Sequence, residues 1–213
     1  MVRVNGRRCR GIQKVEADRM SVEINPRRLR GPWDDGYALD VHTRSSTFLG
    51  YDQFGHPRFD TMRSPVGELL YQLKYRHDHA AVFPLADAAV TFLGQVWKPP
   101  IEAIVTVPPS VARKEQPVVL VATAVSDRLK IPLCGACVAK VKQTPQLKDI
   151  VEYDKRMDTL RGAFAVSAGQ TKGKNLLLFD DLHGSGATVR AIAELLKREG
   201  QAKAVYLLTL TAK

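Results

Sequence analysis

The sequence predicts an α/β protein in which a mainly parallel sheet is flanked by helices, with a small β subdomain near the N-terminus. Residues 103–107, 174–181 and 204–210 are nearly continuous apolar runs, which is typical of strands buried on both faces. Amphipathic segments separate these runs, as expected when helices cover both faces of a parallel sheet. Ligands of such sheets bind at the carboxyl ends of the strands, so we expect the site after Val107, Val141 and Asp181.

The chain divides into three predicted parts. Residues 1–30 form a basic N-terminal extension, residues 31–63 a small β subdomain (the hood), and residues 64–213 the core. In the hood, Tyr37, Leu39 and Val41 alternate with smaller or polar residues, as in a strand. A two- or three-stranded unit with so little apolar content does not stand alone, so it should pack on the core.

The core elements follow from periodicity. A helix begins at Pro65, where proline is tolerated, and two more helices are expected over 80–97 and 116–129. Pro108 ends the strand at 103–107, because proline cannot donate to a central ladder. Further strands are expected over 133–141 and 162–166, and a last helix follows residue 186 and stops at Gly200.

Bulk properties exclude several classes of protein. The 213 residues are 45% hydrophobic and 25% charged, as in ordinary globular domains. No apolar run reaches about 18 residues and none follows the basic N-terminal residues, so neither a membrane span nor a secretory signal is expected. Three cysteines do not suggest a disulfide framework in a chain of this length. We therefore expect a cytoplasmic protein with no membrane partner.

The net charge of +10 is concentrated at the N-terminus. Residues 1–30 hold nine basic and three acidic residues, and none of the thirty is aromatic. Such an arm contacts nucleic acid or another polyanion, or is simply a solvated extension; the sequence leaves both open. Cys134 and Cys137 form a CxxC motif, but two cysteines are too few for a zinc site, and on a strand they point to opposite faces. We expect them to pack in the core.

The strongest local signal is the segment LLLFDDLHGSGATVRAI. A buried strand delivers Asp180 and Asp181, a glycine-containing loop follows, and a helix begins near Gly186–Thr188. Unpaired N–H groups at a helix start favour a phosphate there, and glycines let the backbone approach it closely. Two carboxylates beside a phosphate require a bridge, which ribose hydroxyls or a hydrated Mg²⁺ would supply.

Three other interpretations compete with a sugar-phosphate site. A P-loop needs GxxxxGK[ST], which does not occur, and a dinucleotide fingerprint needs a third glycine or alanine where this chain has Val189. A plain strand–turn–helix junction, with Asp181 helping to cap the helix, is also compatible with the pattern. Two acids on a buried strand would be a costly way to make such a turn.

The segment FDDLHGSGAT resembles the phosphoribosyl pyrophosphate signature of type I phosphoribosyltransferases, with Gly184 and Ser185 where that family usually has two threonines. The resemblance implies the type I phosphoribosyltransferase fold. It also implies that Asp180 and Asp181 hold the ribose hydroxyls and Mg²⁺. The loop would bind the remainder of the ligand, its 5-phosphate above all, through Leu182, His183, Gly184, Ser185, Gly186, Ala187 and Thr188.

Further segments resemble the ComF-like (competence protein F-like) orphan branch of that family, over about residues 66–210: LLYQLKYRHD, VPPSVARKEQP and KQTPQLKDIVEYDKRMDTLRGAF. The cysteine-rich N-terminal zinc finger usual in that branch is missing. The resemblance implies pyrophosphate contacts from Lys74, Pro109, Ser110 and Arg113, with Lys74 and Arg113 aiding catalysis. Snorkelling of Lys74 at a helix end, and a solvated helix start at Arg113, are the structural alternatives.

The resemblance also implies a mobile lid at residues 142–161, for which a plain surface loop is the alternative. The resulting hypothesis is a phosphoribosyltransferase that uses Mg²⁺ and transfers ribose 5-phosphate from phosphoribosyl pyrophosphate to a nitrogen nucleophile such as a nucleobase. Relatives are commonly homodimers. The alternative hypothesis is a non-catalytic sensor of phosphoribosyl pyrophosphate or a nucleotide that contacts nucleic acid through its basic arm.

Overall fold

A five-stranded sheet forms the centre of the molecule. The computed structural model describes residues 22–109, 114–144, 150 and 152–213. The strand order is β1-β2-β9-β8-β5, and every neighbouring pair except β1–β2 is parallel. The strands are β1 (Arg27–Arg28), β2 (Asp35–Val41), β5 (Ala103–Thr106), β8 (Asn175–His183) and β9 (Ala204–Ala212). The predicted α/β class, with a mainly parallel sheet flanked by helices, is confirmed.

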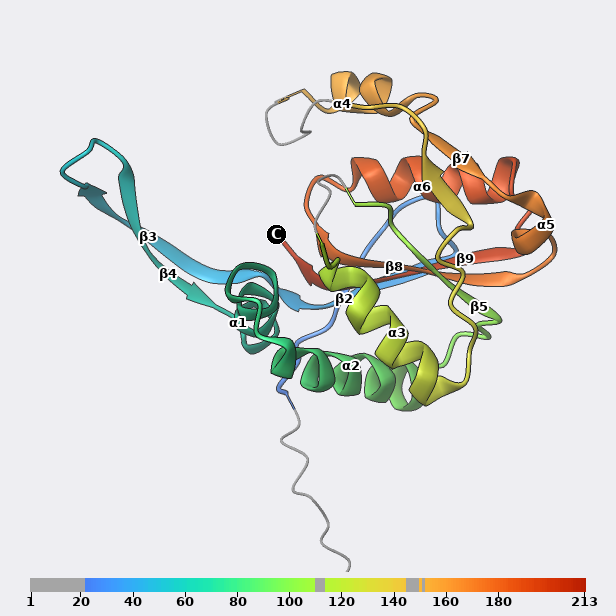
Figure 1. Cartoon of the computed structure of the whole chain (residues 1–213), viewed down its shortest axis with the longest axis horizontal. Coiled ribbons are helices and arrows are strands. Elements are labelled where there is room, and N and C mark those ends of the chain that lie inside the picture. The colour runs from blue at the N-terminus through green and yellow to red at the C-terminus, as the bar shows by residue number, and fades with distance from the viewer. Residues whose placement is uncertain (1–21, 110–113, 145–149, 151) are drawn as a thin grey trace, which may run out of the picture.

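Helices cover both faces of this sheet (Figure 1). One face carries α1 (Pro65–Tyr71), α2 (Val82–Thr91) and α3 (Pro117–Leu129), whose buried residues pack on Leu177, Phe179 and Leu208 of the central strands. The other face carries α6 (Ala187–Arg198), packed on Leu176, Leu178 and Leu207. Both sides of β8 are therefore apolar, which explains the continuous apolar run.

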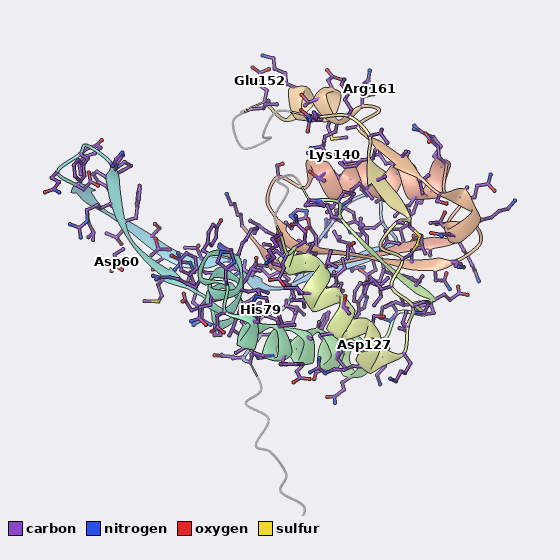
Figure 2. All side chains as sticks on the ribbon, in the orientation of Figure 1. Asp60, His79, Asp127, Lys140, Glu152 and Arg161 are labelled. Atoms are coloured by element: carbon purple, nitrogen blue, oxygen red, sulfur yellow. A yellow bond between two sulfur atoms is a disulfide. The ribbon has the colours of Figure 1, made fainter. Side chains whose placement is uncertain are left out.

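The remaining elements are short. On the α6 side, β6 (Val138–Lys140) and β7 (Phe164–Val166) form a two-stranded antiparallel ribbon. The turns and short helices are η1 (Gln72–Arg76), η2 (His79–Ala81), η3 (Phe92–Trp97), α4 (Tyr153–Leu160) and α5 (Ala168–Thr171). Figure 2 shows α4, between the labelled Glu152 and Arg161, at one side of the molecule beyond α6.

A separate hairpin of β3 (Thr43–Tyr51) and β4 (Pro57–Arg63) projects from the body, carrying Asp60 far from the sheet (Figures 1 and 2). Phe48 and Phe59 are paired across its two strands, and both are at least half exposed. No other described strand pairs with it. The hairpin, rather than the whole hood, is thus the part that leaves the core.

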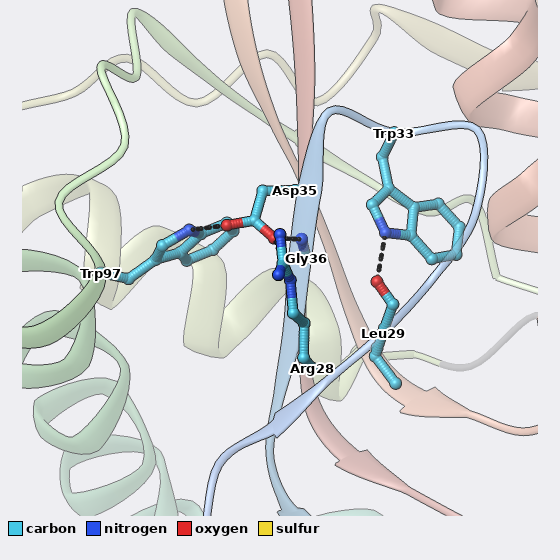
Figure 3. A network of polar contacts seen from close by, with 6 residues as sticks. All are labelled: Arg28, Leu29, Trp33, Asp35, Gly36 and Trp97. Atoms are coloured by element: carbon cyan, nitrogen blue, oxygen red, sulfur yellow. Dashed lines mark hydrogen bonds and ion pairs between the residues drawn. The ribbon is translucent and has the colours of Figure 1, made fainter.

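The segment before the hairpin is fastened to the core by a polar network around Asp35 (Figure 3). The Asp35 carboxylate accepts hydrogen bonds from Trp97 Nε1 at 2.9 Å and from Arg28 Nε at 3.0 Å. The indole N–H of Trp33 donates to the carbonyl of Leu29 at 2.8 Å, and Trp33 is 6% exposed. These contacts hold β1 and β2 against the end of the helix that contains Trp97.

The strands are distributed differently from the three-part division expected from the sequence. Strand β2 belongs to the main sheet, where it pairs in parallel with β9, although its residues fall in the predicted hood. Arg27 and Arg28 of the predicted extension pair with β2, and Ile24 packs against the core. The reason is burial: Ala38 and Leu39 are fully buried on opposite sides of the strand.

Several predicted elements are confirmed: the strands near 103–107, 174–181 and 204–210, and the helices near 65, 80–97, 116–129 and after residue 186. The strand expected over 133–141 is wrong in length and in partner. Only Val138–Lys140 is a strand, and it pairs with β7 outside the main sheet. The loop after Val141 therefore does not follow a strand of the parallel sheet.

One described helix, His79–Trp97, meets the length and composition of a membrane-crossing helix, with a mean hydropathy of 1.3. One such helix is weak evidence for a membrane span, because a core helix passes the same test. Its residues Leu85, Ala89 and Phe92 are fully or almost fully buried against the sheet. Packing on the protein core accounts for its apolar character.

Candidate functional site

The candidate site lies where β8 runs into α6. The two acids predicted to end the strand lie within it, because β8 continues to His183, paired with β9 as far as Ala212. Asp180 is in register with Thr209 of β9. The loop between strand and helix is accordingly short, Gly184–Gly186, and it stands at the carboxyl edge of the sheet.

Asp180 and Asp181 interact through their charges but face opposite sides of the sheet, because neighbouring residues of a strand alternate. Asp181 faces the side of α1 and η1, where its Oδ2 is 2.8 Å from Nζ of Lys74. Both side chains are about one-fifth exposed. Lys74 thus makes an ion pair with Asp181 beside the loop, and its contact with pyrophosphate stays a prediction.

Asp180 lies on the α6 side and is the most perturbed acid of the site. Burial raises its pKa well above the usual 3.8, and the negative charge of Asp181 raises it further. The backbone N–H of Asp181, which donates to Asp180 Oδ1 at 2.9 Å, and the charge of Lys74 oppose the shift without cancelling it. Burial is the largest of these causes, and the residue as a whole is partly buried.

The start of α6 is a free set of backbone donors. Gly186 precedes the helix with φ of 76°, a left-handed conformation, and no side chain of the described residues caps the helix N-terminus. The first N–H groups of a helix have no partner within it, and the helix dipole adds partial positive charge there. Thr188 lies in the first turn and Ser185 is exposed beside it. This arrangement suits an anion such as a phosphate.

His183 supports the loop from within. Its ring meets Trp33 edge-on, with the ring centroids 6.1 Å apart, and its Nε2 is buried with no partner among the described residues. Burial lowers the pKa of His183, and the nearby Arg190 lowers it further. A Cβ on Gly186 would lie 2.8 Å from that Nε2. His183 therefore fills the space beneath the turn and is neutral at physiological pH.

Part of the predicted site lies outside the described residues. Ser110 and Arg113, two of the predicted pyrophosphate ligands, lie in residues 110–113, which the structure does not describe. Pro109, a third predicted ligand, precedes them and is exposed. Of the predicted lid, residues 145–149 and 151 are outside the description, while α4 packs on the buried cluster of α6 through Leu160.

The predicted Mg²⁺ site on Asp180 and Asp181 does not fit this geometry. The carboxylates occupy opposite faces of β8, and one of them is already paired with Lys74. In the described residues no group of three His, Cys, Asp or Glu side chains is arranged to hold a metal. A Mg²⁺ ion at this edge would depend on oxygens of the ligand and of water, which is common for this cation.

Sequence reasoning missed a buried polar cluster on the neighbouring strands. Thr209 and Thr211 of β9 are fully buried, and Asp40 of β2, in register with Thr211, is 1% exposed. Asp40 Oδ1 accepts the N–H of Val41, but its Oδ2 has no partner in the described structure. The signal was a polar TLT run in an otherwise apolar strand and an acid between Leu39 and Val41.

Two hollows of the described surface lie away from the loop before α6. One of about 460 Å³ is at the hairpin tip, lined by Tyr51, Asp52, Gln53, Phe54 and Arg58. A second, of about 320 Å³, lies at residues 140–144 after β6. Neither is lined by Asp180 or by the loop before α6.

No family model matches this sequence, and no curated protein matches it either. Solved structures similar to this chain include the enzyme from Saccharomyces cerevisiae with adenine bound, at 15% identity and a TM-score of 0.42, covering 78% of this chain and 83% of that one. The protein from Thermoanaerobacter pseudethanolicus is 12% identical with a TM-score of 0.43, and the match covers 79% of this chain and 95% of that one. The protein from Trypanosoma brucei, in complex with AMP, pyrophosphate and ribose-5-phosphate, is 13% identical with a TM-score of 0.43. That match covers 82% of this chain and 70% of that one. All three are adenine phosphoribosyltransferases.

Proposed function

We propose that this chain binds phosphoribosyl pyrophosphate and transfers its ribose 5-phosphate to a nitrogen nucleophile, with a nucleobase as the expected acceptor. The observation that carries the proposal is the uncapped start of α6 beside a buried acid. Gly186 presents free backbone donors for the 5-phosphate, and Asp180 precedes the same loop at the carboxyl edge of the sheet.

Each residue has a defined part in this proposal. The loop Gly184–Gly186 and the first turn of α6 hold the 5-phosphate through backbone N–H groups. Asp180, whose pKa is raised by burial, exchanges hydrogen bonds with the ribose hydroxyls. Lys74 is 2.8 Å from Asp181, so a pyrophosphate arriving there shares or replaces that ion pair. Ser110 and Arg113 remain predicted pyrophosphate ligands.

The reaction itself is a substitution at C1 of the ribose. The C1–N bond to the acceptor forms as the C1–O bond breaks, and pyrophosphate leaves with the bonding electrons. The chain contributes positioning of the two reactants and stabilisation of the charges that develop. A Mg²⁺ ion brought in by the ligand, held by oxygens of the ligand and of water, would further neutralise the pyrophosphate. In this proposal the carboxylate of Asp181 helps to stabilise the positive charge that develops at C1.

Titration calorimetry with phosphoribosyl pyrophosphate tests the proposal. We expect binding to the full chain that weakens when EDTA removes Mg²⁺, and that falls about tenfold or more in an Asp180→Asn/Asp181→Asn double variant, a loss of about 1.4 kcal/mol or more. Asp127→Asn, an exposed acid on α3, is the matched control and keeps full affinity. Equal affinity of the double variant and the control would refute the site.

A second assay separates the enzyme from the sensor. Release of pyrophosphate is measured with a panel of nucleobases, using the same variants. Release with one base, lost in the double variant but kept in Asp127→Asn, supports the transferase. Binding without release from any base supports the alternative, a sensor that uses the same ligand site.

A further inference from the structure

The CxxC motif forms a cross-link that the proposed function does not use. Cys134 and Cys137 are joined by a disulfide across a Gly-Ala turn, with their Cα atoms 5.4 Å apart. The expectation that these cysteines lie on opposite faces of a strand and only pack in the core is therefore wrong. They lie in a turn, where two residues three apart in sequence face each other. The third cysteine, Cys9, lies outside the described residues.

The two sulfur atoms differ in their access to solvent. Cys137 is fully buried in the core cluster that contains Val138 and Phe164. Cys134 is partly exposed, and the two residues between the cysteines are exposed. A thiolate from solution therefore reaches the sulfur of Cys134, and the sulfur of Cys137 becomes the leaving group. This asymmetry gives thiol–disulfide exchange a defined direction of attack.

A side-chain acceptor lies ready for the reduced pair. Oε1 of Gln170, from α5, is 2.9 Å from Sγ of Cys134 and 3.5 Å from Sγ of Cys137. A disulfide sulfur carries no hydrogen, so this amide oxygen accepts nothing from the oxidised pair. Once reduced, each thiol is a weak donor within reach of it. The site is thus suited to both oxidation states, whereas a purely structural disulfide needs no such acceptor.

The turn also joins two parts of the fold. The N–H of Cys134 donates to the carbonyl of Ile104 in β5, at 2.8 Å. The carbonyl of Cys137 accepts from the N–H of Ser167, directly after β7, at 2.9 Å. The disulfide closes the short chain between these two anchors. It therefore helps to fasten the β6–β7 ribbon to the edge of the main sheet.

We propose that Cys134 and Cys137 are a reversible redox site for thiol reductants, and that the disulfide state holds the β6–β7 ribbon on the sheet edge. An external thiolate attacks Sγ of Cys134 and forms a mixed disulfide, and the sulfur of Cys137 leaves with the electron pair and takes up a proton. A second external thiol then releases Cys134. Two electrons enter the pair, and two external thiols become one external disulfide. The proposal does not depend on phosphoribosyl pyrophosphate.

The first test follows the thiol count. Full-length protein carrying Cys9→Ser is equilibrated without denaturant in mixtures of reduced and oxidised glutathione. It is then quenched with acid, unfolded in denaturant with excess iodoacetamide so that the buried Cys137 also reacts, and weighed by mass spectrometry. We expect a single reversible step from no alkylated cysteine to two. A Gln170→Ala variant loses the acceptor for the thiols, so its midpoint moves towards the disulfide by about fivefold in the glutathione ratio.

The second test measures whether reduction loosens the β6–β7 ribbon. Hydrogen exchange of the β6–β7 amides should quicken about fivefold or more on reduction, while β2, which β9 and β8 separate from β5 in the sheet, keeps its rate. A Cys134→Ser/Cys137→Ser variant should match the reduced form in any buffer. A disulfide that resists excess dithiothreitol in the folded protein, or a Gln170→Ala midpoint equal to the parent's, would overturn the redox site. Equal ribbon exchange in the two states would overturn the fastening.

Discussion

At the scale of single residues, the charged form of Asp180 is unfavourable in the ligand-free protein, and a bound ligand can relieve this by hydrogen bonding to it. Its pKa is raised by burial and by the charge of Asp181, so the folded chain binds a proton there more tightly than the unfolded chain does. Stability from this group is therefore greatest below the unfolded pKa and falls as pH rises through the folded pKa. At neutral pH, Asp180 disfavours the ligand-free fold.

Replacing Asp180 by Asn removes the free-energy penalty of holding a charged carboxylate at this position. We expect Asp180→Asn to raise the free energy of unfolding at pH 7 by about 1–3 kcal/mol, because a buried acid with too few partners becomes a neutral amide. Urea unfolding at pH 5, 6, 7 and 8 measures it, and the gain over the parent should grow with pH. Asp181→Asn should act in the opposite sense, since it removes the 2.8 Å ion pair between Asp181 and Lys74. A destabilised Asp180→Asn variant would contradict this interpretation.

At the scale of elements, the junction of β8 and α6 depends on the backbone of Gly186. With φ of 76°, an alanine there is strained, and its Cβ would lie 2.8 Å from Nε2 of His183. We expect Gly186→Ala to lower stability by about 1–2 kcal/mol and to weaken phosphoribosyl pyrophosphate binding, because the first turn of α6 must shift. Thermal unfolding and titration calorimetry measure the two effects.

Gly184 offers the matched control for this substitution. No atom lies within 4 Å of a Cβ built on Gly184, and its φ is outside the positive range. Gly184→Ala should therefore leave stability within about 0.5 kcal/mol of the parent. If the two variants lose stability equally, loop composition rather than the left-handed turn governs the start of α6.

The same junction shows how far the sequence could be interpreted. Apolar runs and glycine stops located β8, α6 and β9 correctly, because segments buried in the core must consist largely of apolar residues. The joint role predicted for Asp180 and Asp181 stays a prediction, but the two side chains face opposite sides of β8, which the sequence analysis did not anticipate. Strand alternation, had it been applied past residue 180, separates the two carboxylates.

Other departures have a different cause. The sequence analysis did not place β2 in the main sheet. Its pairing with β9 is a long-range contact, which no local pattern in residues 31–41 specifies. The disulfide was missed because 133–141 was interpreted as one strand, whereas Gly135 and Ala136 form a turn between the cysteines. The ion pair of Lys74 with Asp181 spans 107 positions and is likewise invisible to local patterns.

At the scale of the whole molecule, the basic N-terminus has to be divided at a structural boundary. Residues 22–30 contain β1, and Ile24 and Leu29 pack on the core, so their removal would damage the fold. Residues 1–21 hold six basic and two acidic residues and precede everything described. A truncation that keeps residue 22 onwards therefore removes basic residues without removing core contacts, which a truncation at residue 31 would also remove.

This truncation tests the nucleic-acid alternative. We expect the full chain to bind single-stranded DNA or RNA weakly, with log affinity falling linearly in log salt concentration. Removal of residues 1–21 should flatten that slope by up to about 4, since each of six cations releases about 0.7 counterions from a single strand. Fluorescence anisotropy between 50 and 300 mM KCl measures it. Because the site at β8 and α6 is untouched, binding of phosphoribosyl pyrophosphate should be equal in both chains. An unchanged slope would remove residues 1–21 from any contact with nucleic acid, and the charge of the folded body would then have to account for whatever binding is seen.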